Sequence, residues 1–280
     1  MKKHRYTIKK NIGLLLILFA LVIFLIWTIV PIYIVVSNSF RKTLEMKLMP
    51  PKIIFEPIFS HYQKLLTLDR FGIYFRNSAI ISISTTAFTI ILGSLAAYGL
   101  KICKSGIGRR ISNVLLLGKM VPSITILIPL FMMMNHVHLT GTYLAPILTL
   151  SCLSLPFVTW LMTGFIADIP NELIEAASIE GCSRISIFTK IILPLLRPAI
   201  ASAIILVMQS SWNELIFSLQ LTNLNTYPLT VGIARYVGAV SVDWGKCSAA
   251  ATITMVPIII IGFVMQKFLV SGMTAGAVKG

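Results

Sequence analysis

Charge is scarce in this sequence, and acidic residues are the scarcest of all. Lys, Arg, Asp and Glu make up 12% of the 280 residues, whereas about 25% is usual in a soluble domain. Only nine residues are Asp or Glu against 24 Lys or Arg, which gives a formal net charge of +15. The basic residues stand mostly at the ends of apolar blocks and not among aromatics on a polar surface, so the pattern excludes a nucleic-acid-binding domain.

Motifs that would carry chemistry are also missing. The sequence has no G-x-x-x-x-G-K-[ST] phosphate loop, so we do not expect this chain to hydrolyse ATP. It has no nucleophile–base pair with a supporting motif and no metal-type spacing of cysteines. We therefore expect no catalytic site, no metal and no cofactor on this chain. Single free thiols are predicted at Cys103, Cys152, Cys182 and Cys247.

Apolar residues, in contrast, are abundant and gathered in long blocks. The chain is 56% hydrophobic with a mean hydropathy of +0.89, and several blocks reach the roughly 20 residues that a helix needs to cross a bilayer. We predict an all-α, polytopic membrane protein with six transmembrane helices. The expected spans are Ile12–Val36, Asn77–Leu100, Ser112–Met134, Thr142–Ala167, Pro198–Leu221 and Cys247–Val270.

The first apolar block follows a basic stretch, as in a signal peptide. It is longer than the apolar region of a signal peptide and no small-residue cleavage site follows it, so we expect a retained span. The Lys and Arg distribution favours a cytoplasmic N-terminus, with KICKSGIGRR (101–110) as the clearest cytoplasmic loop, although Arg41 and Lys42 oppose this topology. Residues 1–11 are then a cytoplasmic N-terminus, and residues 12–280 form one six-span domain.

The polar connection at 168–197 is predicted to form two short helices. The first covers Asn171–Glu180, with Asp168 as a candidate N-cap and Gly181 as a left-handed stop. The second runs from Ser183 to Leu193 and is expected to end at the proline that follows. Both have an apolar face, at Leu173, Ile174 and Ala177 in the first helix and at Phe188, Ile191 and Ile192 in the second.

Such a helix pair suits docking onto a partner in the cytoplasm. The alternative is an amphipathic connector that lies on the membrane surface. An interfacial helix would favour bulky anchors and a denser set of Lys and Arg on its polar face, so docking is the favoured interpretation.

The same segment matches the pattern EAA-x3-G-x9-I-x-L-P. The fixed positions are Glu175, Ala176, Ala177, Gly181, Ile191, Leu193 and Pro194. A chance match has a probability of about one in 10⁸ per window at ordinary residue frequencies. The segment resembles the EAA loop of ABC importer permeases. Trp212-Asn213-Glu214 and the ending SGMTAGAVKG (271–280) extend the resemblance to the MalG-type permeases of carbohydrate importers. Glu180 and Cys182 are mild departures, because the family more often has Asp and Ala there.

The resemblance implies a type I ABC importer permease whose 168–197 segment is a cytoplasmic coupling helix and whose tail, 271–280, also reaches the ATPases. It implies that the seven fixed positions couple the permease to an ATPase dimer, which binds ATP and Mg. A second, MalF-like permease and an extracytoplasmic sugar-binding protein are the other implied partners. The implied location is the bacterial inner membrane with both termini in the cytoplasm. The implied cargo is a di- or oligosaccharide, and polyols or glycerol phosphates are the second choice.

The fifth predicted span carries the only carboxylate expected inside the membrane. Ser210, Glu214 and Ser218 recur at steps of four and would share one face of a continuous helix. An ionisable group there should face the bundle interior or water. The resemblance implies that the fifth span is among those that line the translocation path, so we predict that these residues and Asn213 line or gate it. The alternative is a structural role in which Glu214 pairs with a neighbouring subunit.

Lys119 lies about 10 Å into the third predicted span at 1.5 Å per residue. Its side chain either snorkels to the cytoplasmic interface or pairs with a group inside the bundle. A rival class of protein, an ion-driven secondary transporter for a polar solute, would use Glu214 and Lys119 as a charge relay. That reading leaves the EAA match unexplained. A membrane-embedded enzyme is disfavoured because no catalytic cluster is present.

Overall fold

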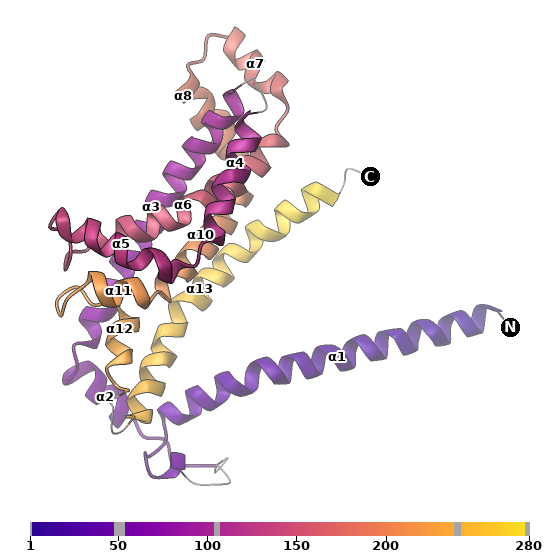
Figure 1. The fold of residues 1–280 in the computed structure, drawn as a ribbon. Helices are drawn as coiled ribbons and strands as arrows, with labels where there is room; N and C mark the ends of the chain where they lie inside the picture. Colours follow the sequence, from indigo (N-terminus) through magenta and orange to yellow (C-terminus); the bar gives the residue numbers. More distant parts are fainter. Residues whose placement is uncertain (1, 48–53, 104–106, 238–241, 278–280) are drawn as a thin grey trace. The chain divides into compact units, whose positions relative to one another are not determined.

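The computed structural model describes residues 2–47, 54–103, 107–237 and 242–277, and over this part of the chain every named element is a helix (Figure 1). The chain divides into two compact units, Met1–Arg70 with Tyr236–Ile253, and Phe71–Arg235 with Thr254–Gly280. The elements in chain order are α1 (Lys2–Ser39), η1 (Glu45–Lys47), α2 (Ser60–Thr67), α3 (Phe71–Ile102), α4 (Ile107–Leu117), η2 (Gly118–Met120), α5 (Ser123–His136), α6 (Leu144–Ala167), α7 (Asn171–Ile179), α8 (Arg184–Ile187), the π-helical turn η3 (Phe188–Ile192), α9 (Leu193–Leu195), α10 (Arg197–Trp212), α11 (Ile216–Leu221), α12 (Leu229–Ala234) and α13 (Trp244–Ala277).

Four helices in the described part of the chain are long and apolar enough to cross a membrane. They are Gly13–Ser39 of α1, the whole of α3, the whole of α6 and Trp244–Gln266 of α13. Two further candidates are bent pairs of helices, Arg110–Met120 with Ser123–His136 at 95° and Arg184–Leu195 with Arg197–Trp212 at 76°. The protein is therefore embedded in a membrane through four to six apolar spans.

The third predicted span, Ser112–Met134, is not one helix. The chain turns at Val121, which has the extended backbone angles φ −69° and ψ 124°, and α5 begins after Pro122. A proline has no N–H for the helix ladder, and it pushes the residue before it out of the helical region. The predicted span is therefore two helices, which are long and apolar enough for a membrane span only as a bent pair.

The fifth predicted span, Pro198–Leu221, is interrupted as well. Helix α10 ends at Trp212, and α11 starts only at Ile216. Trp212 is buried, and its indole N–H donates to the carbonyl of Thr254 in α13 at 3.2 Å. Two of the predicted path residues, Asn213 and Glu214, lie between the two helices. Their hydrogen bonds, described with the candidate site, account for the break.

The second unit is built around α3 and α6, whose contact face consists of small and polar side chains. The buried positions of α3 recur at helical spacing and include Ser78, Ser82, Thr85, Thr86, Thr89, Gly93, Ser94 and Ala97. The backbones come so close that a Cβ added at Gly93 would lie 2.7 Å from Cγ1 of Val158 in α6. Small residues of this kind allow the backbones of two membrane helices to approach closely. Such packing matters in a bilayer because the hydrophobic effect does not drive helices together in lipid.

A polar cluster ties the start of α3 to the 222–235 segment. The Asn77 amide donates to the carbonyls of Asn225 at 2.9 Å and Tyr227 at 3.0 Å, and its oxygen accepts from the Tyr143 hydroxyl at 2.7 Å. The Ser78 hydroxyl accepts from the N–H of Leu229 at 2.8 Å. These bonds satisfy the backbone of an irregular segment, which at membrane depth is tolerated only where protein or water does so. Within this unit, α12 lies at one end, and α7 and α8 lie at the other (Figure 1).

The first unit joins the end of α1 to α2 and the start of α13. The hydroxyls of Ser39 and Tyr62 are 2.7 Å apart, and His61 Nε2 is 2.8 Å from the carbonyl oxygen of Arg41. Lys246 at the start of α13 forms an ion pair with Asp69 at 2.9 Å. The unit is therefore held by polar contacts at one end of its long helices.

Candidate functional site

The candidate site begins with α7, which carries the EAA sequence and ends in a left-handed glycine. Gly181 has φ +79°, as predicted for a C-terminal stop. The N–H of Cys182 donates to the carbonyl of Ala177 at 3.0 Å and that of Gly181 to Ser178 at 3.1 Å, so the last carbonyls of the helix are satisfied. The residue preceding the helix is Pro170, without a side-chain cap. The prediction of Asp168 as N-cap was wrong, because Asp168 ends α6.

The second helix begins as predicted but does not stop at Pro194. The Ser183 hydroxyl caps α8 by accepting from the N–H of Ser186 at 3.2 Å. The helix then widens into the π turn η3 and continues through Pro194 to Leu195 in α9. A proline interrupts the ladder because it cannot donate to the residue four positions earlier. The π turn lies directly before that interruption, so the chain passes the proline and bends only after Leu195.

One face of this helix pair is buried against the ends of α3 and α6, within the second unit. Ala177, Ile187, Phe188 and Ile192 belong to the same apolar cluster as side chains from the ends of α3 and α6. Ile174 and Ile191 are partly buried against the cluster, in agreement with the predicted apolar faces. The other members of that cluster include Ala97, Tyr98, Val158, Met162, Ile166 and Ile169. Leu173 was expected on the same face but is 46% exposed.

Two side chains from the end of α3 fasten the pair. The Tyr98 hydroxyl donates to the carbonyl of Arg184 at 3.1 Å, and its ring lies 5.3 Å from that of Phe188. The Lys101 ammonium donates to the carbonyl of Ile169 at 3.3 Å. The sequence predicted Lys101 only as a topological charge, and no pattern indicated either contact. Both acceptors are backbone atoms, which any residue supplies.

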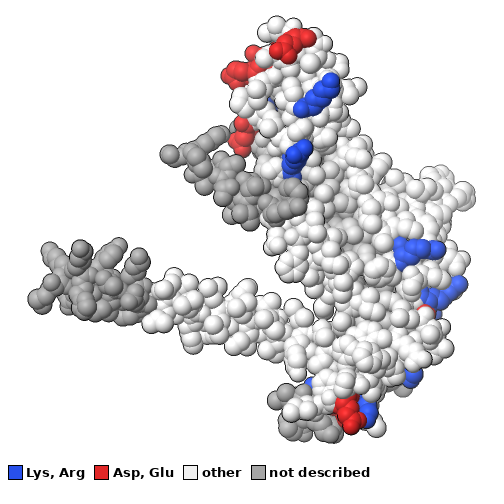
Figure 2. All heavy atoms as spheres, turned by 180° about the vertical axis from the view of Figure 1, so that it is seen from behind, with Lys and Arg blue, Asp and Glu red and all other residues white. Residues whose placement is uncertain are grey.

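The opposite face of the pair is exposed and combines apolar with acidic side chains. Ile179 is 87% exposed and Ile185 is 77% exposed. Four of the nine acidic residues of the chain lie within 13 positions that contain no Lys or Arg. Glu172 and Glu180 are exposed, Asp168 precedes α7, and Glu175 lines a hollow beside the end of α3. Acidic side chains gather over the end that carries α7 (Figure 2). An uncovered surface of this composition is suited to a partner protein with a basic, partly apolar recess.

The seven motif positions do not share one environment. Glu175, Ala176, Gly181 and Pro194 are exposed, Ala177 is buried, and Ile191 and Leu193 are intermediate. A hollow of about 1060 Å³ lies beside α7 and is lined by side chains of α3, α7 and α8, among them Tyr98, Lys101, Glu175 and Arg184. The exposed motif residues are thus free to contact another chain, while the remainder hold the helix pair in place.

Glu214 of the predicted path is the residue that starts α11. Its carboxylate accepts from the N–H groups of Phe217 at 2.7 Å and Ser218 at 2.8 Å, and from the Ser218 hydroxyl at 2.8 Å. Thr230 donates to the Glu214 carbonyl at 2.6 Å. A carboxylate is favourable at a helix N-terminus, where the first N–H groups have no partner within the helix. This capping explains why the fifth predicted span is broken.

The other predicted path residues are therefore not aligned on one helical face, and that part of the prediction was wrong. Ser218 is buried and lies with Glu214, whereas Ser210 is exposed near the end of α10. Asn213 is exposed, and its amide donates to the carbonyl of Gln209 at 3.0 Å. Lys119 lies in η2, at the 95° bend, and shares a hollow of about 260 Å³ with Ser210. The structure thus places Glu214 and Ser218 together at the start of α11, and Ser210 apart from them in the hollow with Lys119.

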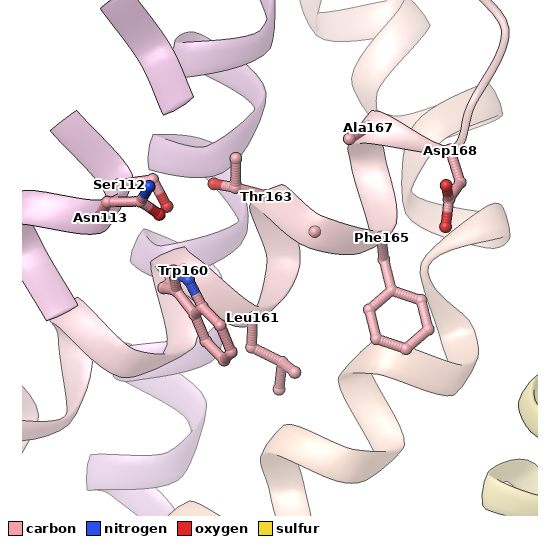
Figure 3. Close-up of a pocket in the computed structure, with 9 residues that line it drawn as sticks. Ser112, Asn113, Trp160, Leu161, Thr163, Phe165, Ala167 and Asp168 are labelled. Atoms are coloured by element: carbon pink, nitrogen blue, oxygen red, sulfur yellow. The ribbon is translucent and has the colours of Figure 1, made fainter. Parts of the chain in front are cut away.

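A third hollow, of about 510 Å³, surrounds the end of α6. Thr163 points toward Ser112 and Asn113 of α4, whereas Phe165 and Asp168 lie on the other side of α6 (Figure 3). The polar side chains therefore do not converge on one point. In the described ranges no group of three or more His, Cys, Asp or Glu is arranged to hold a metal ion.

The described part of the chain combines bent apolar spans around a small-residue helix interface with a glycine-capped helix pair at one end. The family model described as "Binding-protein-dependent transport system inner membrane component" matches residues 89–275. The chain belongs to this family. It is a membrane permease subunit of an ATP-driven, binding-protein-dependent ABC importer, and this family of subunits is not enzymatic.

Relatives and solved structures agree with this assignment. The chain is 35% identical to the trehalose/maltose transport system permease protein MalG of Thermococcus litoralis, over 82% of this chain and 84% of that one. It is 33% identical to the sulfoquinovosyl glycerol transport system permease protein SmoH of Agrobacterium fabrum, over 80% of this chain and 79% of that one. A chain from the crystal structure of a bacterial ABC transporter involved in import of the acidic polysaccharide alginate has the same fold, with a TM-score of 0.78, 21% identity, and coverage of 92% of this chain and 96% of that one. The fold is accordingly that of type I ABC importer permeases.

Proposed function

We propose that this chain carries a sugar across the bacterial inner membrane by alternating access, in a complex with a second, MalF-like permease, an ATPase dimer and an extracytoplasmic sugar-binding protein. Each bent helix pair counts as one span in this proposal, so that six spans place both termini and the 168–197 segment in the cytoplasm. ATP and Mg are bound by the ATPase. The names of the relatives support a carbohydrate cargo, since they include trehalose, maltose and sulfoquinovosyl glycerol.

The observation that carries the proposal is the two-sided character of the 168–197 segment. One side is buried with the ends of α3 and α6, through Ala177, Ile187 and Ile192. The other side leaves Ile179 and Ile185 exposed. A segment fastened to the spanning helices on one side and uncovered on the other is suited to pass a movement from a docked protein to the spans.

The seven motif positions divide between these two tasks. Glu175 and Ala176 are exposed and are the proposed contacts with the ATPase. Gly181 sets the angle between α7 and α8, because a left-handed residue redirects the chain there. Ala177, Ile191 and Leu193 shape the side that faces the spanning helices, and the chain bends after Pro194 and Leu195. In this proposal α7 and α8 move as one body when the ATPase dimer closes.

The path residues are proposed to act as two groups. Asn213 and Glu214 form the hinge between α10 and α11, and Glu214 and Ser218 hold the start of α11. Ser210 lines the hollow beside Lys119. The relay of an ion-driven transporter finds no support in this geometry, because both oxygens of Glu214 accept hydrogen bonds from α11, and no ion pair joins Glu214 to Lys119 in the described residues.

A native thiol beside Gly181 offers a direct test of the docking face. Cys182 is exposed, and so is Cys152 within α6. Two single-cysteine variants are compared in native membranes, one that retains only Cys182 and one that retains only Cys152, each treated with a short thiol-to-amine cross-linker. We expect Cys182 to give a covalent product with a P-loop ATPase and Cys152 to give none, with both products identified by mass spectrometry.

The opposite result would refute the proposed docking. If the complex is purified intact but Cys182 joins only lipid amines, the segment lies on the membrane surface as an amphipathic connector. If the chain purifies alone and still moves solute in liposomes, the ion-driven transporter replaces the importer.

A further inference from the structure

Lys119 is an exposed cation of the second unit whose side chain lines a hollow between helices. It occupies η2, at the bend between α4 and α5, and lines a hollow of about 260 Å³ together with Leu116, Ser154, Phe157, Leu206, Val207 and Ser210. The hollow is thus walled by α4, α6 and α10, and its polar groups are one ammonium and two hydroxyls.

The hollow lies at mid-depth of the spanning helices. Ser154 is about 15 Å of helical rise from Leu144 and about 20 Å from Ala167, the two ends of α6. The apolar core of a bilayer is about 30 Å thick, so this part of α6 lies near its centre. The bend at Val121 holds the Lys119 backbone beside this level instead of near the polar loop before α4.

No counter-charge within the described part of the chain neutralises this ammonium. Lys119 forms no ion pair or hydrogen bond there, and the nearest carboxylate along α10 and its continuation, Glu214, is occupied by capping α11. Lys101 is the internal comparison, because its ammonium is tied to the carbonyl of Ile169. An ammonium with only a structural role would be held in the same manner. A charge at this depth is costly unless it faces water or an anion.

The chemistry around Lys119 is that of a receptor for an anionic group on a polyhydroxy compound. The Ser154 hydroxyl has no hydrogen-bond partner within the described residues, and the Ser210 hydroxyl donates to the carbonyl of Val207 at 3.0 Å, which leaves its lone pairs free. Phe157 adds an aromatic face beside them. A serine hydroxyl can form hydrogen bonds with sugar hydroxyls or with anionic oxygens. An ammonium forms its strongest hydrogen bonds with anionic oxygens.

We propose that Lys119 is a specificity-determining residue of the translocation path, and that the cargo is a sugar bearing a carboxylate, phosphate or sulfonate group, which Lys119 binds in passage with Ser154 and Ser210. This inference rests on the proposed function and narrows its cargo. It assigns to this subunit a direct contact with the transported molecule.

The test uses the complete importer with its partner subunits and binding protein in liposomes. The probes are four disaccharides that differ only at carbon 6, which carries a hydroxyl, a carboxylate, a phosphate or a sulfonate. ATP-dependent uptake is measured for the wild type, Lys119→Met, Lys119→Arg and the control Lys64→Met, which removes an exposed lysine of α2. We expect wild-type uptake of at least one anionic probe, a rise in its KM of about tenfold or more in Lys119→Met, and recovery in Lys119→Arg.

Each other outcome overturns the inference in a recognisable manner. Uptake of the hydroxyl probe alone removes the anionic cargo and leaves the importer intact. An unchanged KM in Lys119→Met removes Lys119 from the path. If Lys119→Met and Lys119→Gln both fail to assemble while Lys119→Arg assembles, the counter-anion belongs to the second permease and not to the cargo. Absence of ATP-dependent uptake of all four probes refutes the proposed function itself.

Discussion

Gly181 permits a prediction in which steric and conformational effects are separated. Its φ of +79° lies in the left-handed region, and a Cβ added there meets no atom within 4 Å. A substitution at this position therefore creates no clash. It penalises only the backbone conformation that sets the angle between α7 and α8.

The size of the penalty follows from that conformation. An L-residue in the left-handed region costs roughly 1–2 kcal/mol relative to glycine, and 1–2 kcal/mol is a factor of about 5–30 in an equilibrium. Asn enters this region more readily than most residues, whereas a β-branched residue is a true outlier there. The expected order of retained turn geometry is therefore Gly, Asn, Ala and then Val.

The measurement is the ratio of sugar transported to ATP hydrolysed by the reconstituted importer. We expect this ratio to fall in the same order, by a few-fold in Gly181→Asn and by about tenfold or more in Gly181→Val, while thermal unfolding of the spanning part is unchanged. The matched control is Gly99→Ala in α3, where a Cβ also meets nothing within 4 Å but the backbone is helical. That control should keep the wild-type ratio, since Ala is the better helix former.

Two results would refute the reasoning about Gly181. A wild-type ratio in Gly181→Val means that the turn geometry does not transmit the movement. Equal losses in the Asn and Val variants mean that the cause is loss of glycine as a close-contact surface and not backbone strain.

Three further changes have expected outcomes that follow from single contacts. Glu214→Ala removes the cap of α11 and should lower the stability of the detergent-solubilised complex by about 0.5–2 kcal/mol, whereas Glu214→Gln, which keeps one acceptor oxygen, should lose less; equal thermal shifts in the two variants would contradict a capping role. Gly93→Val should destabilise by roughly 1–3 kcal/mol, because its Cβ would meet Val158 at 2.7 Å, and Val158→Ala should restore part of that loss in the double variant; additive losses would exclude the close approach of α3 and α6. Asn77→Ala should cost about 1–3 kcal/mol, because it removes the buried amide that donates to the carbonyls of Asn225 and Tyr227, and Asn77→Asp should not rescue it; thermal unfolding at wild-type temperature would exclude this role.

The local structure of the 168–197 segment was predictable from sequence because short-range rules decide it. A glycine after an Ala-rich helix adopted the left-handed stop, and Ser183 capped the helix that follows. The spans were predictable as apolar blocks for a similar reason, since a bilayer demands length and composition only. The assignment of the family came from the EAA spacing, which no composition would have supplied.

What escaped the sequence depends on contacts between distant residues. Glu214 was interpreted as one of three residues on a helical face, because spacing alone does not show that its carboxylate caps a new helix that begins at Ile216. Tyr98 and Lys101 donate to backbone carbonyl groups. Because every residue has such a group, no side chain in the sequence indicates the acceptor. Pro122 ended a helix and Pro194 did not, and only the packing around each distinguishes the two.

The hydrogen bonds that hold the 168–197 segment determine which of its side chains are free to change. Tyr98 and Lys101 donate hydrogen bonds to main-chain oxygens of the segment, so a change of side chain at Arg184 or Ile169 leaves both acceptors in place. Exposed residues of α7 such as Ile179 can therefore change without loss of the two hydrogen bonds that join the segment to α3. The attachment of the segment and the composition of its exposed surface can thus vary independently of each other.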